Sequence, residues 1–186
     1  IEVWRLALSK WPNHRQAPEI TNQIRLAFQN QNEFEQAMSV QSELSRFGEG
    51  SDWWNSNTDN PAEQREAEEL AEQALIASAI QQHQMAQRER RHCVEEIQAG
   101  NEAEAVEKCR QAQVFYGNAA DAYRSYLDRY PNSPNAYELH YNLADALYWS
   151  ERYEEAAVEY GSVRDSNLDD VHLSESARRV VERVAP

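Results

Sequence analysis

The residues of this chain that could do chemistry are two cysteines and five histidines. Cys93 and Cys109 lie on either side of Gly100, and His92 precedes the first cysteine directly. Two cysteines can form a disulfide, or they can contribute to a zinc site if four ligands converge. Two Cys with a single neighbouring His fall short of that number, so we expect no metal site.

The histidines and carboxylates show no catalytic pattern. The five histidines are scattered without the i, i+4 pairing around Glu that marks a zinc-binding helix: His14, His83, His92, His140 and His172. Neither a Gly-rich phosphate loop nor a nucleophile elbow occurs. Carboxylates are numerous, but proximity without burial does not raise a pKa to a catalytic value. We therefore expect no catalytic residues, no cofactor and no enzymatic activity.

Charge and hydropathy limit the classes of partner. The formal net charge of -14 comes from 32 acidic and 18 basic residues and would repel a phosphate backbone, so nucleic acid is not an expected partner. One basic cluster, Arg88, Arg90, Arg91 and His92, is flanked by glutamates and reads as a solvated helix face. No apolar run approaches the ~20 residues that span a bilayer. The chain opens at Ile1 in an apparent mid-helix, which suggests a longer parent protein.

Glycine and proline divide the chain into helices, and no stretch alternates like a strand. The 186 residues include only five Gly and six Pro. The expected helices cover 1–10, 18–30, 33–47, 62–99, 102–130, 135–149, 152–164 and 171–184. The longest irregular stretch, 48–60, contains Trp53 and Trp54. These indoles either cap the apolar end of the long hairpin near Leu70 and Tyr130 or contact a partner.

The sequence also repeats itself. When Pro12 is placed on Pro131, about 40 residues align without a gap. The aligned pairs include Trp4 with Tyr123, Leu8 with Leu127, Trp11 with Tyr130, Ala17 with Ala136, Ile24 with Leu143, Phe34 with Tyr153 and Ala37 with Ala156. A self-match of this kind indicates that one supersecondary unit occurs twice, and such units bury their apolar faces against neighbours.

The repeated unit resembles the tetratricopeptide repeat (TPR), an antiparallel helix pair. In residues 137–170 the matching positions are Leu143, Ala144, Leu147, Tyr153, Ala156, Tyr160 and Val163, with Leu168 where the family usually has Pro. Residues 18–51 match through Ile24, Phe28, Phe34, Ala37 and Leu44, and are degenerate because Arg25 and Gln41 depart from the pattern. The long hairpin matches at Cys93, Ala105, Cys109 and Ala112. The motifs look most like TPR proteins of the bacterial cell envelope, of the Tol-associated periplasmic and outer-membrane assembly lipoprotein types.

The resemblance implies an all-α fold, an α-solenoid of TPR-like helix hairpins with one elongated central hairpin. We expect a single array over 1–186, a fragment of a longer protein. Its parts are a half repeat (1–12), a degenerate repeat (17–51), the elongated hairpin (62–131), a repeat (136–168) and a terminal helix (171–184).

The turn at Gly100 places Cys93 and Cys109 opposite one another on antiparallel helices. They form either a disulfide or a pair of reduced, small hydrophobic residues in the hairpin core. A disulfide indicates an oxidising compartment such as the periplasm, whereas reduced cysteines fit the cytoplasm.

In a TPR stack the first helix of each pair lines a concave groove. Carried over to this chain, the resemblance assigns that groove to Glu138, Tyr141, Asp145, Tyr148 and Trp149, with a more polar surface at Asn22 and Gln29. Tyr and Trp beside an acidic residue could anchor a peptide. Alternatively, Tyr148 and Trp149 pack against the last helix around Val180 and Val181.

The function that these patterns favour is a non-enzymatic scaffold in a cell-envelope assembly, which binds a protein or peptide in the groove and does not itself span the membrane. One alternative is a structural spacer that self-associates end to end. Another is a regulatory domain attached to a catalytic domain outside this sequence.

Overall fold

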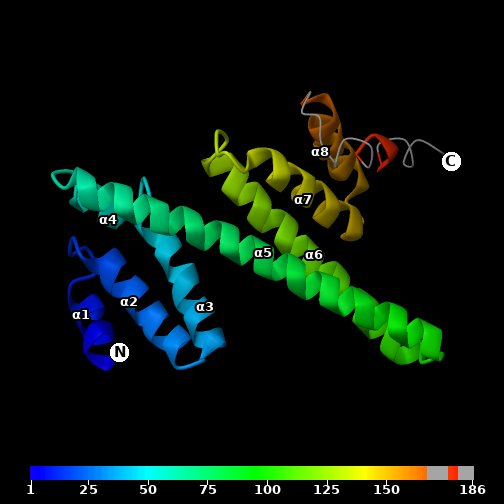
Figure 1. Cartoon of the computed structure of the whole chain (residues 1–186), viewed down its shortest axis with the longest axis horizontal. Helices are drawn as coiled ribbons and strands as arrows, with labels where there is room; N and C mark the ends of the chain where they lie inside the picture. The colour runs from blue at the N-terminus through cyan, green and yellow to red at the C-terminus, as the bar shows by residue number, and fades with distance from the viewer. Residues whose placement is uncertain (167–175, 180–186) are drawn as a thin grey trace. The chain divides into compact units, whose positions relative to one another are not determined.

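The computed structural model describes residues 1–166 and 176–179, and all regular structure in these residues is helical (Figure 1). The predicted terminal helix, 171–184, is described only at 176–179, where it is helical. Leu168, His172, Val180, Val181 and the side chain of Phe34 lie outside the described residues. The chain divides into two compact units, Ile1–Ser78 and Ala79–Pro186, which we treat separately.

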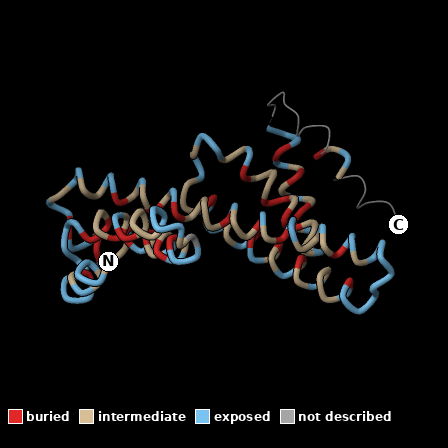
Figure 2. Tube along the Cα trace, turned by 60° about the horizontal axis from the view of Figure 1, so that its bottom comes forward, coloured by how far each residue is buried: buried red, intermediate tan, exposed pale blue. Residues whose placement is uncertain are grey.

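The first unit contains α1 (Glu2–Lys10), α2 (Ala17–Asn30), α3 (Phe34–Glu43), the 3-10 helix η1 (Leu44–Phe47), α4 (Asp52–Ser56) and the start of α5 (Pro61–Ala99). Its buried core takes residues from every one of these elements: Leu8, Ala17, Ile24, Val40, Leu44, Phe47, Trp53, Ala67 and Ala74. In Figure 2 these buried positions follow the faces that the helices turn toward one another. Burying each large apolar side chain contributes about 1.5–3 kcal/mol.

Helix α4 corrects the prediction of an irregular stretch at 48–60. Ser51 caps the helix, since its hydroxyl accepts a hydrogen bond of 3.1 Å from Trp54 N–H. Trp53 is 2% exposed, and its indole N–H donates to His14 O at 2.8 Å. A helix of five residues is too short to be stable by itself, so its burial against the core stabilises it.

Trp53 is therefore a core residue, and Trp54 is half-buried and packs against the same cluster. Trp53 packs edge-on against Phe47, with ring centroids 5.9 Å apart, and Leu70 packs against the same cluster as expected. Tyr130, the other expected neighbour, belongs to the second unit and stacks against Tyr126 at 5.1 Å.

Helix α1 leaves one face uncovered. Its exposed large hydrophobic residues are Val3, Trp4 and Leu6, and Trp11 follows at its end. A shallow apolar cavity of about 360 Å³ lies beside Leu8 and Trp11, between α1 and the start of α2.

The second unit is built from the rest of α5, α6 (Glu102–Arg129), α7 (Ala136–Trp149) and α8 (Tyr153–Asp165). Helix α6 returns antiparallel to α5, α7 packs on α6, and α8 packs on α7 (Figure 1). Small buried residues such as Ala79, Ala86, Ala112 and Ala119 allow α5 and α6 to approach closely.

The two copies of the sequence repeat have the same local structure, one copy in each unit. With Pro12 placed on Pro131, the end of α1, both bounds of α2 and the start of α3 coincide with the corresponding bounds of α6, α7 and α8. Each hairpin turn contains a residue in the left-handed region, Asn32 (φ 60°) in the first copy and Glu151 (φ 65°) in the second. The self-match therefore reflects one recurring supersecondary unit.

An ion-pair network holds the start of α8 against α6. The Arg152 guanidinium donates to Asp121 on α6 at 2.7 Å and to Glu155 on α8 at 2.8 Å, and Arg124 contacts Glu155 at 2.7 Å. The hydrogen bond from Arg152 is the main cause that lowers the pKa of Glu155 to about 2, with Arg124 contributing.

This network predicts a small loss of stability in acid. Because folding lowers the pKa of Glu155 from 4.5 to about 2, the stabilisation is complete above pH 4.5 and is lost as the pH falls toward 2. The Glu155 side chain is 44% exposed, so solvent screening limits the effect to about 0.5–1 kcal/mol. Urea unfolding followed against pH should show this loss in the native chain and a smaller one in Glu155→Gln. Equal slopes in the two proteins would contradict the role given to Glu155.

Candidate functional site

The α5–α6 hairpin of the second unit is closed by a turn and pinned by a disulfide. Gly100 has φ +77°, which only glycine adopts without strain, and its N–H donates to Ile97 O at 3.2 Å. Cys93 and Cys109 are joined in a disulfide with their Cα atoms 4.9 Å apart. Of the two states that the sequence left open, the structure has the oxidised one.

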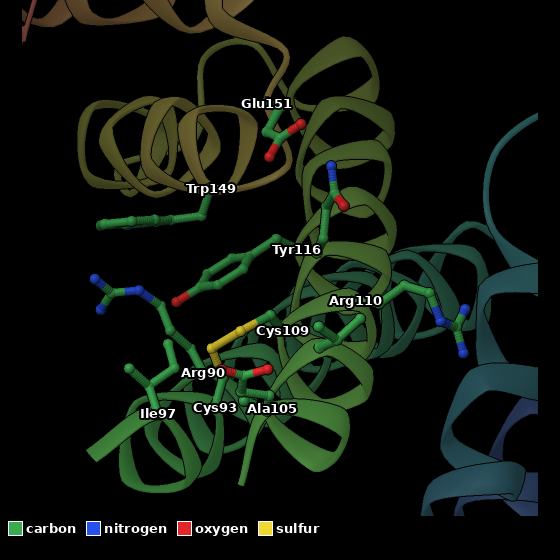
Figure 3. A pocket seen from close by; sticks show the side chains of 13 residues that line it. Arg90, Cys93, Ile97, Ala105, Cys109, Arg110, Tyr116, Trp149 and Glu151 are labelled. Carbon is green, nitrogen blue, oxygen red and sulfur yellow. A yellow bond between two sulfur atoms is a disulfide. The ribbon is translucent and has the colours of Figure 1, made fainter. Parts of the chain in front are cut away.

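A groove of about 700 Å³ opens over this disulfide (Figure 3). Helices α5 and α6 form its floor, and Trp149 at the end of α7 forms a wall. Its lining residues are Arg90, Cys93, Ile97, Glu102, Ala105, Val106, Cys109, Arg110, Ala112, Gln113, Tyr116, Trp149 and Glu151. Ile97 and Val106 are 61% and 70% exposed, so the groove presents aliphatic surface to solvent.

A cation lies on the aromatic wall of the groove. The Arg90 guanidinium carbon is 3.5 Å from the centroid of the Trp149 ring, and the Tyr116 ring is 6.3 Å from the same indole. In Figure 3 the Arg90 side chain extends past the disulfide toward the face of Trp149. Burial raises the pKa of Tyr116 to about 12, with the Asp145 charge adding to the shift and Arg90 opposing it. The phenol is therefore neutral at physiological pH.

Behind this wall, the Asp145 carboxylate holds Trp149 in place. The indole N–H of Trp149 donates to Asp145 Oδ1 at 3.1 Å, and the Tyr160 hydroxyl donates to the same oxygen at 3.5 Å. His83 Nε2 lies 3.4 Å from Asp145 Oδ2 without a hydrogen bond. Asp145 thus links residues of α5, α7 and α8.

His83, one of the five scattered histidines, is a buried residue. It is 6% exposed, and its Nδ1 lies 3.3 Å from the Tyr123 hydroxyl. Its ring packs edge-on against Tyr116 and Tyr123, with centroids 5.6 and 5.8 Å away. Burial is the main cause that raises the pKa of Tyr123 above its ordinary value. His83, Tyr116, Tyr123 and Asp145 thus form a polar cluster in the interior of the second unit.

The structure brings one of the residues assigned to the concave surface of α7 into this groove, namely Trp149. Asp145 belongs to the polar cluster. Tyr148 packs against Trp149 and Tyr153 at 5.1 and 5.5 Å. Tyr141 packs against Tyr160 at 6.0 Å.

The remaining predicted positions lie elsewhere. Glu138 is exposed near the start of α7 and does not line the groove. Asn22 and Gln29 belong to α2 in the first unit, where both side chains accept hydrogen bonds from Arg25 at 3.0 and 3.3 Å. Arg25, which departs from the repeat pattern, therefore holds the polar side chains of Asn22 and Gln29 in place.

The contact with the last part of the chain is partly visible. The Arg179 guanidinium carbon lies 4.2 Å from the centroid of Tyr148 and 5.5 Å from that of Trp149. The expected contacts at Val180 and Val181 fall outside the described residues. Two guanidinium groups therefore lie over the Trp149 ring, that of Arg90 on α5 and that of Arg179. Trp149 also lines the groove.

Sequence reasoning passed over Arg90, Ile97 and Val106. Arg90 sits in a basic cluster flanked by glutamates, a pattern typical of a solvated face. The one available signal was the aliphatic pair itself, because Ile97 and Val106 flank the hairpin turn, where polar residues are usual.

The described residues contain neither a cluster of metal ligands nor a helix that could span a membrane. No group of three His, Cys, Asp or Glu side chains within residues 1–166 and 176–179 could hold a metal ion. None of the helices in that part of the chain combines the length and apolarity needed to cross a membrane.

The chain was compared with known protein families and with curated proteins. No family model matches it, and no curated protein does.

Proposed function

We propose that this chain is a non-enzymatic protein-binding scaffold, built from TPR-like helix hairpins, and that it holds a partner protein in the groove of the second unit. The observation that carries the proposal is the surface formed by Ile97, Val106 and Trp149 above the disulfide. Trp and Arg are enriched in the binding hot spots of protein interfaces, and here a Trp with a stacked Arg lies beside exposed aliphatic surface.

The repeated hairpins support a scaffold. In repeat proteins, hairpins of this kind stack against neighbouring hairpins, and the extended surfaces that result are used for protein binding. The likeness of the repeats to the TPR family points the same way. In this proposal Trp149 supplies the contribution of α7 to the binding surface, and Asn22 and Gln29 supply a separate, polar surface in the first unit.

The disulfide supports a location in the bacterial cell envelope. Disulfides persist in oxidising compartments such as the periplasm and are rare in the cytosol. A scaffold of a periplasmic or envelope assembly fits both the Cys93–Cys109 bridge and the resemblance of the motifs to envelope TPR proteins.

The proposal is tested by placing a charge in the groove. Val106→Asp puts a carboxylate on the apolar surface without disturbing the core, since Val106 is 70% exposed. We expect capture of a partner from envelope extracts to fall roughly tenfold, because an unpaired charge must be desolvated in the interface. Affinity capture with quantitative mass spectrometry measures this.

Val158→Asp is the matched control, since Val158 is 66% exposed on α8 and does not line the groove. It should leave capture unchanged. If both variants capture the partner as well as the native chain does, the groove is not the binding surface.

A second candidate function, self-association, is favoured by the uncovered face of α1 with Val3, Leu6 and Trp11. In that case the captured protein would be a second copy of this chain, and Val106→Asp would not affect its capture.

A further inference from the structure

One of the cations that line the groove, Arg90, has no ion-pair partner in the part of the chain that the structure describes. Arg110, the other cation of the groove, pairs with Glu107 at 2.7 Å. Arg90 stacks on Trp149 and has no carboxylate within ion-pair distance among the described residues. Its neighbours on α5, Arg88 and Arg91, likewise make no ion pair in the described part of the chain, and Glu89 pairs with Lys108 at 3.2 Å.

Stacking leaves the hydrogen-bonding edge of Arg90 available. A guanidinium that lies over an indole uses its π face, while its five N–H groups point outward in the plane. That edge matches a carboxylate, which accepts two parallel hydrogen bonds. The Asp145–Trp149 hydrogen bond of 3.1 Å fixes the indole, so the guanidinium is held in place before any ligand arrives.

The surroundings of Arg90 define what else the ligand must carry. The adjacent floor consists of the disulfide, Ala105 and Ala112, with the aliphatic side chains of Ile97 and Val106 beyond. A bound segment must therefore bring an apolar side chain to the floor and an acidic group to the wall. Glu102 and Glu151 also line the groove, so the site for an acidic group is local to Arg90, which has no ion-pair partner within residues 1–166 and 176–179.

We propose that the groove recognises a segment of a partner protein in which an apolar side chain packs on the Cys93–Cys109 disulfide and a neighbouring Asp or Glu side chain pairs with Arg90. This inference rests on the proposed function and specifies the partner's chemistry. Arg90 is the specificity-determining residue, and Trp149 positions it.

The experiment selects random peptides from a display library against the intact, disulfide-bonded chain. The peptides are joined to their carrier at the C-terminus, so that carboxylates come only from side chains. A parallel library with free C-termini tests the other source of a carboxylate. Binders are kept if Val106→Asp abolishes their binding, which restricts the set to groove ligands.

We expect the kept peptides to share an apolar residue next to an Asp or Glu. Their affinity should fall roughly tenfold or more for Arg90→Gln, the loss typical of a charge-assisted hydrogen bond. Arg91→Gln removes the same net charge from an exposed neighbour outside the groove lining, and it should change affinity less than about twofold. Arg90→Lys should be intermediate, because it keeps the charge without the planar fork.

A change on the peptide side gives the same test with the native protein. Replacing the acidic residue by its amide should cost the native chain roughly tenfold and should cost Arg90→Gln nothing further, since the pair is already broken.

The inference is overturned if the kept peptides share no acidic position, if Arg90→Gln and Arg91→Gln weaken binding equally, or if only peptides with a free C-terminus bind. In each of these cases the groove still binds peptides and the scaffold function stands. If no peptide binds the native chain better than Val106→Asp, both the inference and the proposed function fail.

Discussion

Removing the disulfide should lower the free energy of unfolding of the second unit by about 3 kcal/mol. The bridge closes a short loop of α5 and α6, and the loop-entropy model gives about this value for a loop of that size. The variant is Cys93→Ala with Cys109→Ala, which leaves small apolar side chains at a close helix crossing. Urea unfolding measures the change, and hydrogen exchange of α6 amides assigns it to the second unit.

The native chain provides the internal control. A reducing agent should destabilise the native chain by a similar amount and should leave the double variant unaffected. If the native and double-variant proteins unfold at the same urea concentration, the bridge contributes nothing to stability and serves only as part of the groove floor.

Asp145→Ala should cost about 2–3 kcal/mol and should also weaken binding in the groove. The substitution removes the acceptor for the Trp149 indole N–H and for the Tyr160 hydroxyl, and it takes away the charge next to His83. A buried donor left without its acceptor costs about 1–3 kcal/mol. The freed indole would no longer hold Arg90, so a loss of peptide affinity should accompany the loss of stability.

Asp145→Asn separates the hydrogen bonds of Asp145 from its charge, since an amide oxygen still accepts from the Trp149 indole N–H. It should cost less in urea unfolding and should retain most of the binding. Asp128→Ala, at an exposed position on α6, is the control and should change stability by less than about 0.5 kcal/mol. Equal stability of Asp145→Ala and the native chain would show that the hydrogen bonds around Asp145 do not hold the wall.

The helices followed from local rules, and the exceptions have a physical cause. Pro12, Gly100 and Pro131 marked boundaries that the structure has within a residue or two, because proline and a left-handed glycine end helices, whereas Gly117 and Gly161 lie inside α6 and α8. Helix α4 was missed because Gly48 and Gly50, which precede it, signal a loop. Its stability comes from the burial of Trp53 against residues distant in the sequence, which a local pattern does not contain.

The site was less accessible from sequence than the fold. The TPR resemblance treats the inner face of α7 as open, and it assigned Asp145, Tyr148 and Trp149 to that face. In this chain the elongated α5 brings His83 and Arg90 to α7, so that Asp145 is satisfied internally and Trp149 becomes a wall. A repeat pattern predicts how the two helices of a hairpin pack on each other. It does not predict the contacts that an unusually long helix, here α5, makes with α7.

The central claim, that the second unit binds a partner protein in the groove over the disulfide, is tested most directly by site-specific photo-crosslinking in the cells that produce the protein. A photo-crosslinking residue is placed at position 106 in the groove and, in a second strain, at position 158 on α8. We predict a discrete crosslinked partner from position 106 and none from position 158. No adduct at 106, or the same adducts from both positions, would contradict the claim.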